Sequence, residues 1–148
     1  GLAAAGVDPF VDAPVGRDTR ARTRMAVTAS GREARTRYQV SERFDGATLL
    51  AVTLETGRTH QIRVHMAALK CPLVGDHTYG ASALASRTPE PARTLLSTFP
   101  RPALHAQLLG FSHPVSGEAL RFEAPWPEDL ESLRRGLREA AARQKGGS

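Results

Sequence analysis

Hydrophobic and polar residues alternate along residues 34–44, which is the pattern of a strand that buries one face. This pattern predicts a half-buried strand at Ala34–Phe44, and Arg24–Ala29 before it favours a short strand. The dipeptide Asp45-Gly46 favours a two-residue turn into a third run, Ala47–Glu55. We therefore expect an antiparallel hairpin in this part of the chain.

The spacing of apolar residues changes to that of a helix at Thr59. Ile62, Met66 and Leu69 lie at i, i+4 and i+7, so they share one face of a helix. We expect the helix to run from Thr59 to Lys70, with these three side chains facing the core and Pro72 ending it.

The region after this helix combines an irregular stretch with a second pair of strands. Residues Ala81–Pro102 contain four prolines and predict a long irregular segment. Leu104–Phe111 and Ala119–Glu123 favour strands joined by a turn at His113–Gly117.

The two ends of the chain differ in pattern. Residues 1–16 are rich in Ala, Gly and Pro and predict a loop or a torn end, whereas Pro127 takes the favoured first position of a helix. The buried stripe of that helix would be Leu130, Leu133 and Leu137. The elements together predict an α+β fold, a largely antiparallel mixed sheet with flanking helices, in a single domain over residues 1–148.

Length and composition agree with one globular domain. The chain has 148 residues, of which 41% are hydrophobic, so it can bury a core. No apolar run approaches membrane-spanning length, and we expect no membrane partner. Cys71 is the single cysteine, which fits a reducing cytoplasm.

The positive charge is concentrated in one segment. The formal net charge is +5, and residues 16–37 hold seven arginines against two acidic residues, Asp18 and Glu33. Such a segment is typical of a protein that binds a polyanion. The alternative is compositional drift, because Arg and Ala are abundant and Lys is nearly absent.

A strand-to-helix corner holds the densest set of polar side chains in the chain. Free backbone N–H groups at a helix start, with arginines beside them, suit phosphates and carboxylates. Thr56 could instead cap the helix, and His60 and His65 could be packed histidines. The donor-rich residues at this corner are Arg58, His60, Gln61 and Arg63.

Residues 56–80, TGRTHQIRVHMAALKCPLVGDHTYG, resemble the signature of the RluA-type RNA pseudouridine synthases. The resemblance covers nearly the whole chain and implies part of a pseudouridine synthase catalytic domain. It also implies cofactor-free isomerisation of uridine to pseudouridine in structured RNA, with ribosomal RNA the commonest target and transfer RNA the next. Further segments in the family's order are Thr23–Val27, Arg37–Tyr38, Leu104–Ala106, His113–Gly117 and Phe122–Asp129.

The resemblance matches Arg63 to the family arginine that pairs with the catalytic aspartate and keeps it ionised. The family carries that aspartate in an HRLDxxTSG motif, which this sequence does not contain. Asp18, in Gly16-Arg17-Asp18-Thr19, looks like a candidate for this aspartate, but it lacks the preceding Leu and the small-residue ending of the motif. We therefore expect the chain to be the C-terminal portion of a catalytic domain and inactive alone. Without its partner, Arg63 should be unpaired, exposed or bound to an anion from solvent.

We expect RNA contacts from two groups of residues. Arg20, Arg22 and Arg24 belong to the basic segment, whereas Arg58, His60 and Gln61 belong to the corner. No obligate protein partner is evident.

Several possible metal ligands lie within residues 60–77. The spacing of the available donors fits no zinc finger or zinc ribbon, so we expect no metal. These donors are His60, His65, Cys71 and His77.

Two other classes of function fit the same residues. One is a non-catalytic RNA-binding module, and the other is a soluble domain whose arginines reflect genome composition only. An HRLDxxTSG-like sequence upstream of Gly1 in the parent gene would favour the synthase, and its absence the binding module.

Overall fold

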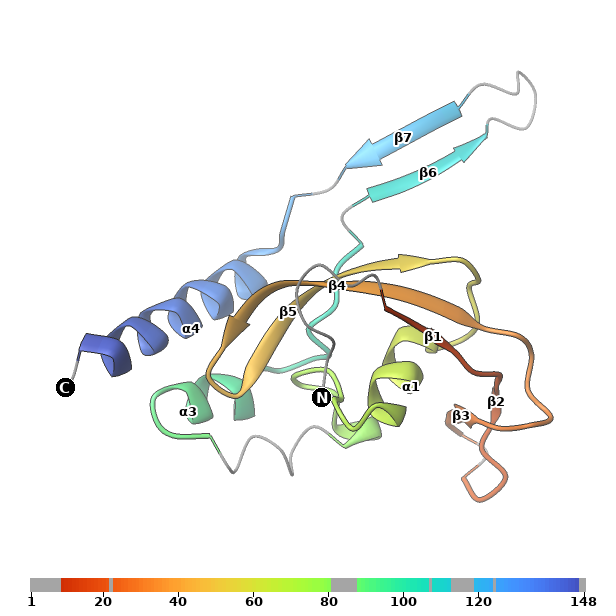
Figure 1. The fold of residues 1–148 in the computed structure, drawn as a ribbon, viewed down its shortest axis with the longest axis horizontal. Coiled ribbons are helices and arrows are strands. Elements are labelled where there is room, and N and C mark those ends of the chain that lie inside the picture. The colour runs from red at the N-terminus through yellow and green to blue at the C-terminus, as the bar shows by residue number, and fades with distance from the viewer. Residues whose placement is uncertain are drawn as a thin grey trace.

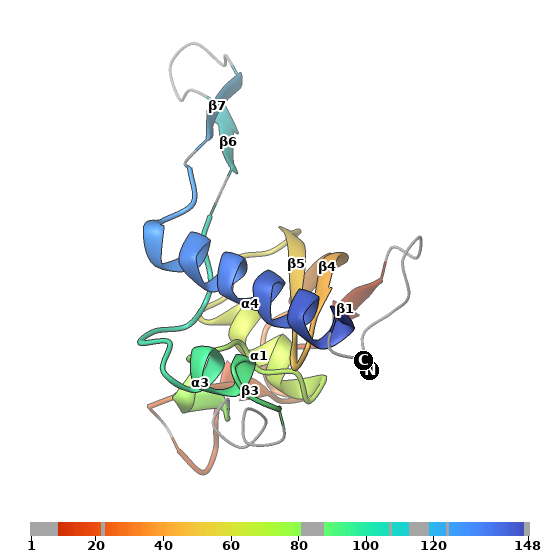
Figure 2. The same cartoon turned by 90° about the vertical axis from the view of Figure 1, so that its left-hand side faces the viewer.

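The computed structural model describes residues 9–21, 23–80, 88–106, 108–112, 119–123 and 125–146. Figure 1 shows a long, curved hairpin at the centre of the molecule, with helices at one face and one end of it. A second hairpin projects away from this body (Figures 1 and 2).

The central sheet has three strands in the order β1-β4-β5, namely Phe10–Asp12, Arg35–Phe44 and Ala47–Leu54. β4 and β5 pair antiparallel and are joined through Asp45 and Gly46, and Gly46 has the positive φ of 76° that such a turn requires. The hairpin predicted from the alternating pattern is therefore confirmed.

A small second sheet pairs β2 (Val15–Arg17) with β3 (Met25–Val27). The prediction that residues 1–16 form a loop is wrong where the structure describes them, because β1 and β2 lie there and Val15 is 2% exposed. The partner of β1 lies far along the chain, with Phe10 opposite Arg37. β2 pairs with the nearby β3, but each of β1 and β2 has only three residues, which is too short for an alternating pattern to reveal.

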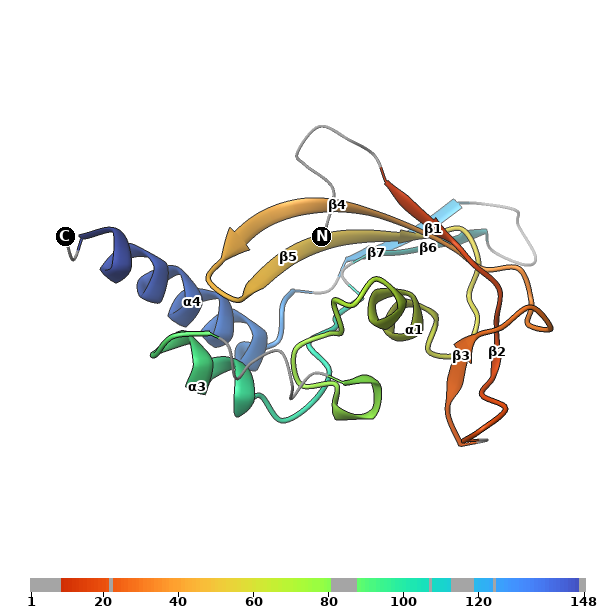
Figure 3. The same cartoon turned by 60° about the horizontal axis from the view of Figure 1, so that its bottom comes forward.

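Helix α1 (Gln61–Ala68) packs against one face of the central sheet (Figures 1 and 3). It begins two residues later than predicted and ends before Pro72. The predicted buried face is partly wrong: Leu69 is 36% exposed and Ile62 is half-buried, whereas Val64 and Met66 are buried. The buried face also includes polar residues, which a hydrophobic pattern assigns to the surface.

The C-terminal part holds two further helices, α3 (Ala92–Ser97) and α4 (Glu128–Gly146), which pack on each other beside the end of the β4–β5 hairpin (Figure 2). The stripe predicted for α4 is confirmed, since Leu130, Leu133 and Leu137 are buried. α3 was not predicted, because the surrounding prolines indicated irregular structure.

The projecting hairpin is formed by β6 (Leu108–Ser112) and β7 (Ala119–Glu123). β6 begins four residues later than predicted, and the predicted turn at His113–Gly117 lies outside the described residues. Every pairing between described strands is antiparallel, which confirms the α+β class and the antiparallel arrangement. The strands form three separate sheets.

Two cores define two regions of the molecule. The corner region, built from β2, β3, α1 and the 3-10 turn η1 (His77–Tyr79), surrounds the small core of Val15, Ala34 and Val64. The C-terminal region, built from α3, α4 and the end of the β4–β5 hairpin, surrounds a larger apolar core. That core consists of Ala92, Leu96, Phe99, Leu130, Leu133, Leu137 and Ala140.

None of the described helices combines the length and apolar character needed to cross a membrane.

Candidate functional site

The corner is held together by the amide of Gln61, which is 3% exposed. Its oxygen accepts hydrogen bonds from the backbone N–H of Arg58 (3.0 Å) and the hydroxyl of Thr56 (2.7 Å). Its nitrogen donates to the Arg35 carbonyl (2.9 Å) and to Thr36 Oγ1 (2.9 Å). The backbone partners fix the amide orientation, since an N–H only donates and a carbonyl only accepts. Every polar atom of this side chain is engaged within the corner, and the RNA contact of Gln61 stays a prediction.

The same network continues to His65, which is completely buried. His65 Nδ1 lies 2.8 Å from Thr36 Oγ1, which also accepts the hydrogen bond from Gln61. His65 Nε2 then donates to the Ala13 carbonyl at 2.8 Å. Of the two alternatives for His65, the packed histidine is therefore confirmed. The histidine ties α1 to the segment before β2.

The backbone at the start of α1 is set by His60, which has a positive φ of 54°. No side chain caps the helix at this end, so the alternative role of Thr56 as a cap is wrong. Thr56 instead accepts a hydrogen bond from the backbone N–H of Arg35 (2.9 Å) and donates to Gln61. His60 itself is exposed, as an RNA contact requires.

Arg63 forms a two-point ion pair with Asp76. Arg63 Nε donates to Asp76 Oδ2 at 2.8 Å, and Arg63 Nη2 donates to Oδ1 at 2.9 Å. The side chain of Arg63 is 19% exposed and that of Asp76 only 1%. The hydrogen bonds to Asp76 raise the pKa of Arg63, against the opposing effect of burial. The expectation that Arg63 is unpaired in this chain is wrong.

Tyr79 lies against the face of Arg63, with the guanidinium carbon 5.0 Å from the ring centre. This distance is within the range of a cation–π interaction. The Tyr79 hydroxyl accepts a hydrogen bond from the Met25 N–H (3.0 Å) and lies 3.1 Å from His60 Nδ1. Tyr79 therefore links β3, α1 and η1 around Arg63.

Neither Asp76 nor Tyr79 was predicted to take part in the site. One signal in the sequence could have identified Asp76. It is the only acidic residue between Glu55 and Glu90, so it is the only carboxylate that this stretch offers to Arg63.

The other residues predicted to bind RNA differ in their freedom to do so. Arg58 is half-buried, and its Nε donates to the Glu33 carbonyl at 2.8 Å. Arg20 is exposed, and its guanidinium contacts no carboxylate of the described chain. Arg24 is bound in the corner region, through the Thr78 carbonyl (3.1 Å) and the Asp18 carboxylate (3.2 Å). Arg22 lies outside the described residues.

Asp18 stabilises a surface turn. Its carboxylate accepts hydrogen bonds from the backbone N–H groups of Arg20 (2.8 Å) and Ala21 (3.4 Å). The bond from Arg20 has the largest effect in lowering the pKa of Asp18, and Arg24 lowers it further. These contacts give Asp18 a structural explanation that needs no catalytic role.

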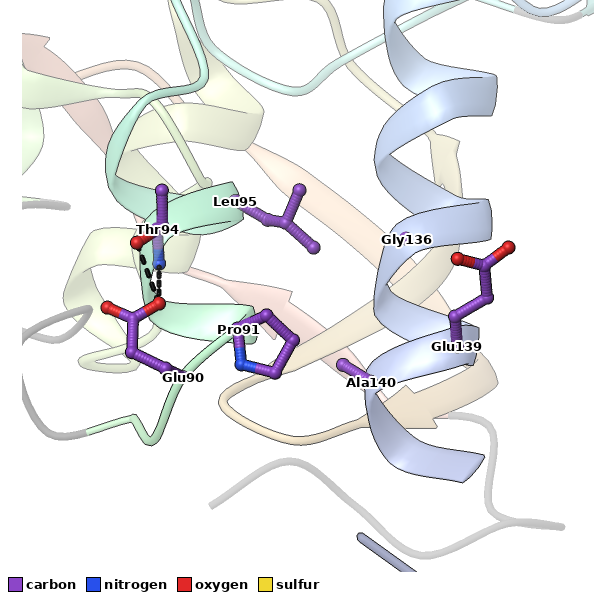
Figure 4. A pocket seen from close by; sticks show the side chains of 7 residues that line it. All are labelled: Glu90, Pro91, Thr94, Leu95, Gly136, Glu139 and Ala140. Atoms are coloured by element: carbon purple, nitrogen blue, oxygen red, sulfur yellow. Dashed lines mark hydrogen bonds between the residues drawn. The ribbon is translucent and has the colours of Figure 1, made fainter. Parts of the chain in front are cut away.

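Figure 4 shows the residues that line a groove between α3 and α4, none of which belongs to the corner. The volume of this groove is about 410 Å³. Leu95 points towards Gly136 across this groove, and a Cβ at Gly136 would lie 2.9 Å from Leu95 Cδ1. The groove is therefore part of the close packing of two helices. Its lining residues are Glu90, Pro91, Thr94, Leu95, Gly136, Glu139 and Ala140.

Within the described ranges, no three His, Cys, Asp or Glu side chains converge as a bound metal ion would require. The polar chemistry of the corner is that of hydrogen-bond donors, with Arg63 at its centre.

Comparisons with known proteins agree on one family. The family model described as RNA pseudouridylate synthase matches residues 6–68. The chain is 53% identical over 136 residues to ribosomal large subunit pseudouridine synthase D of Xanthomonas campestris pv. campestris, covering 89% of this chain and 40% of that protein. The corresponding protein of Vibrio cholerae is 48% identical over 133 residues, covering 89% of this chain and 41% of that protein.

A solved structure gives the same answer for the fold. The human protein RNA pseudouridylate synthase domain containing 1 superposes with a TM-score of 0.63 at 27% identity, covering 85% of this chain and 52% of that one. The chain spans about two fifths of the length of the two curated relatives. By its sequence, its fold and the residues of its corner, this chain belongs to the RNA pseudouridylate synthase family.

Proposed function

We propose that the whole protein containing this chain isomerises uridine to pseudouridine in structured RNA. Ribosomal RNA of the large subunit is the proposed target, with transfer RNA the next candidate. The names of two relatives that are identical to this chain at about half of the aligned residues support this target. No cofactor is needed for an isomerisation of this kind, and the proposed site of action is the cytoplasm.

One observation carries this proposal. Arg63 is held by Asp76 through two hydrogen bonds and still has N–H donors without a partner among the described residues. The target uridine must leave its base stack before its glycosidic bond can be reached. A carboxylate then assists cleavage of the C1′–N1 bond, the uracil rotates, C5 joins the sugar, and the proton on C5 is lost while N1 gains one from solvent. A cation beside that carboxylate keeps it ionised and fixes its orientation. We assign that role to Arg63.

We further propose that the reacting carboxylate lies in the whole protein but outside these 148 residues. Asp76 is 1% exposed with both oxygens bound to Arg63, and Asp18 is bound to backbone N–H groups and to Arg24. Neither carboxylate is therefore free to act on a nucleotide. The family motif that carries the catalytic aspartate is absent from this sequence.

The RNA partner would be held by basic and polar side chains of the corner and of the basic segment. Arg58, His60, Arg20 and Arg22 are the proposed contacts, and Arg24 contributes to a smaller extent because it is already bound to Asp18. Phosphate contacts of this type position an RNA without reading its sequence.

The test is release of tritium from RNA labelled with 5-³H-uridine, measured for the whole protein and for this chain alone. We expect turnover by the whole protein and none by the chain. Turnover by the isolated chain would contradict the proposal that the reacting carboxylate lies outside these 148 residues. Asp18 would then become the candidate. RNA binding without turnover by the whole protein would contradict the synthase and favour the non-catalytic binding module.

A further inference from the structure

The guanidinium of Arg63 has two edges that can each hold a carboxylate. The first edge, formed by Nε and Nη2, is occupied by Asp76 at 2.8 and 2.9 Å. The second edge, formed by Nη1 and the other proton of Nη2, has no hydrogen-bond partner among the described residues. A guanidinium carries five N–H donors in one plane, so the open edge offers a second fork of the same shape.

The backbone of Asp76 is fixed independently of Arg63. The residue before it, Gly75, has a φ of 79°, and a Cβ there would lie 2.0 Å from the Arg101 carbonyl oxygen. The backbone N–H of Asp76 donates to the Leu73 carbonyl at 3.0 Å. With a side chain that is 1% exposed, Asp76 is a rigid support for the arginine.

The same turn also holds the face of Arg63. Tyr79 follows Asp76 by three residues, its ring lies 5.0 Å from the guanidinium carbon, and its hydroxyl is bound to the backbone of Met25. One edge and one face of Arg63 are thus set by Asp76 and Tyr79, and the second edge is open among the described residues.

We propose that Asp76 is a positioning residue for catalysis: by holding the inner edge of Arg63, it directs the open edge at the reacting carboxylate. This inference rests on the proposed function, because it needs a second carboxylate from elsewhere in the whole protein. Arg63 would then lie between two carboxylates, one structural and one reacting. An error of about 1 Å in such an arrangement can slow a reaction by about 100-fold.

The test compares four forms of the whole protein: unsubstituted, Asp76→Asn, Arg63→Lys and the double variant. The rate of pseudouridine formation under single turnover and the Kd for RNA are both measured. Asp76→Asn should slow the reaction by about 10- to 100-fold, with the Kd for RNA unchanged within about twofold. A lysine has no planar pair of donors to orient. In the Arg63→Lys background, adding Asp76→Asn should therefore slow the reaction by less than about twofold.

Asp129→Asn is the matched control, because Asp129 holds Arg101 by the same two-point pair in the C-terminal region. Its rate should stay within about twofold of the unsubstituted protein. An Asp76→Asn protein with an unchanged rate would overturn the proposal. Equal loss of rate from Asp76→Asn in both backgrounds would also overturn it, since that result marks a merely structural aspartate.

A second measurement does not depend on activity. In ¹⁵N NMR spectra of this chain, the Nε–H of Arg63 should exchange slowly with water, and Asp76→Asn should remove that protection while Asp129→Asn leaves it. Fast exchange at Arg63 in the unsubstituted chain would overturn the positioning role. If Arg63 is protected but the whole protein shows no turnover, the proposed reaction is contradicted. Failure of the reaction and failure of the positioning role are therefore distinguishable.

Discussion

Arg63 with Asp76, and Arg101 with Asp129, form pairs with the same hydrogen bonds in two different regions. In both pairs Nε donates to Oδ2 and Nη2 donates to Oδ1, at 2.8 and 2.9 Å in the corner region and at 2.9 Å in the C-terminal region. Each arginine also lies over an aromatic ring. Pair geometry alone therefore does not distinguish a functional arginine from a structural one.

The two pairs differ in burial and in their remaining donors. Asp76 is 1% exposed, whereas Asp129 is 39% exposed. Arg101 also uses Nη1, which donates to the Pro102 and Leu104 carbonyls at 3.2 and 3.3 Å. Arg63 makes no such bond within the described chain. A buried carboxylate combined with an open arginine edge indicates a site prepared for a second anion.

The largest stability difference should come from removing the two arginines. Arg63→Met leaves the buried Asp76 without its partner, and should cost about 3 kcal/mol, near the lower end for a broken buried pair because 19% of Arg63 is exposed. Arg101→Met leaves Asp129 in contact with water and should shift the urea midpoint of this chain much less. An equal or larger shift for Arg101→Met would contradict the comparison.

The second prediction concerns the buried polar network of the corner region. Gln61→Ala leaves the Arg35 carbonyl and the Arg58 N–H without their buried partner, so it should lower the free energy of unfolding by about 2 kcal/mol. Gln39→Ala, at an exposed position of β4, is the control and should change it by less than about 0.5 kcal/mol. Similar urea midpoints for the two variants would show that the network contributes little.

The exposed pair should respond to pH and salt. The hydrogen bonds from Arg101 lower the pKa of Asp129, so the pair contributes stability above the ordinary pKa of an aspartate and loses it as pH falls through the folded-state pKa. The stability difference between the unsubstituted chain and Asp129→Asn should therefore be present at about pH 6 and vanish near about pH 2. It should also shrink in about 1 M salt. A difference independent of pH and salt would argue against an ionic contribution.

The smallest effect is expected for single cations at the RNA surface. Arg20→Gln in the whole protein should reduce the slope of log K for RNA against log salt by up to about 0.7, the value for one phosphate contact on a single strand. Arg93→Gln is the control, because Arg93 lies on α3 and is paired with Glu90. Equal slopes for Arg20→Gln and the unsubstituted protein would make Arg20 a solvated charge.

Elements defined by local sequence could be predicted, and those defined by distant contacts could not. The β4–β5 hairpin follows from alternation and one turn, and the buried stripe of α4 follows from helical spacing. The buried face of α1 was misassigned because Gln61 is buried through hydrogen bonds to β4, which hydrophobicity does not reveal. β1 depends on a partner remote in sequence, and β2, which pairs with the nearby β3, is only three residues long.

The site shows the same division. The resemblance selected Arg63 because its motif is contiguous, but the pairing of Arg63 with Asp76 joins residues on a helix and on a separate turn. Sequence spacing alone did not show that the two meet. The open edge of Arg63 could be recognised only after its other donors were placed.

The most direct test of Arg63 as the partner of the reacting carboxylate is tritium release from 5-³H-uridine-labelled RNA. The whole protein carrying Arg63→Met is compared with the whole protein carrying Arg101→Met, both at a temperature where urea titration shows them folded. Arg63→Met should lose at least about 100-fold in rate, as expected when a positioned cation is removed from a developing charge, and Arg101→Met should stay near the unsubstituted rate. Full activity of the Arg63→Met protein would contradict the account.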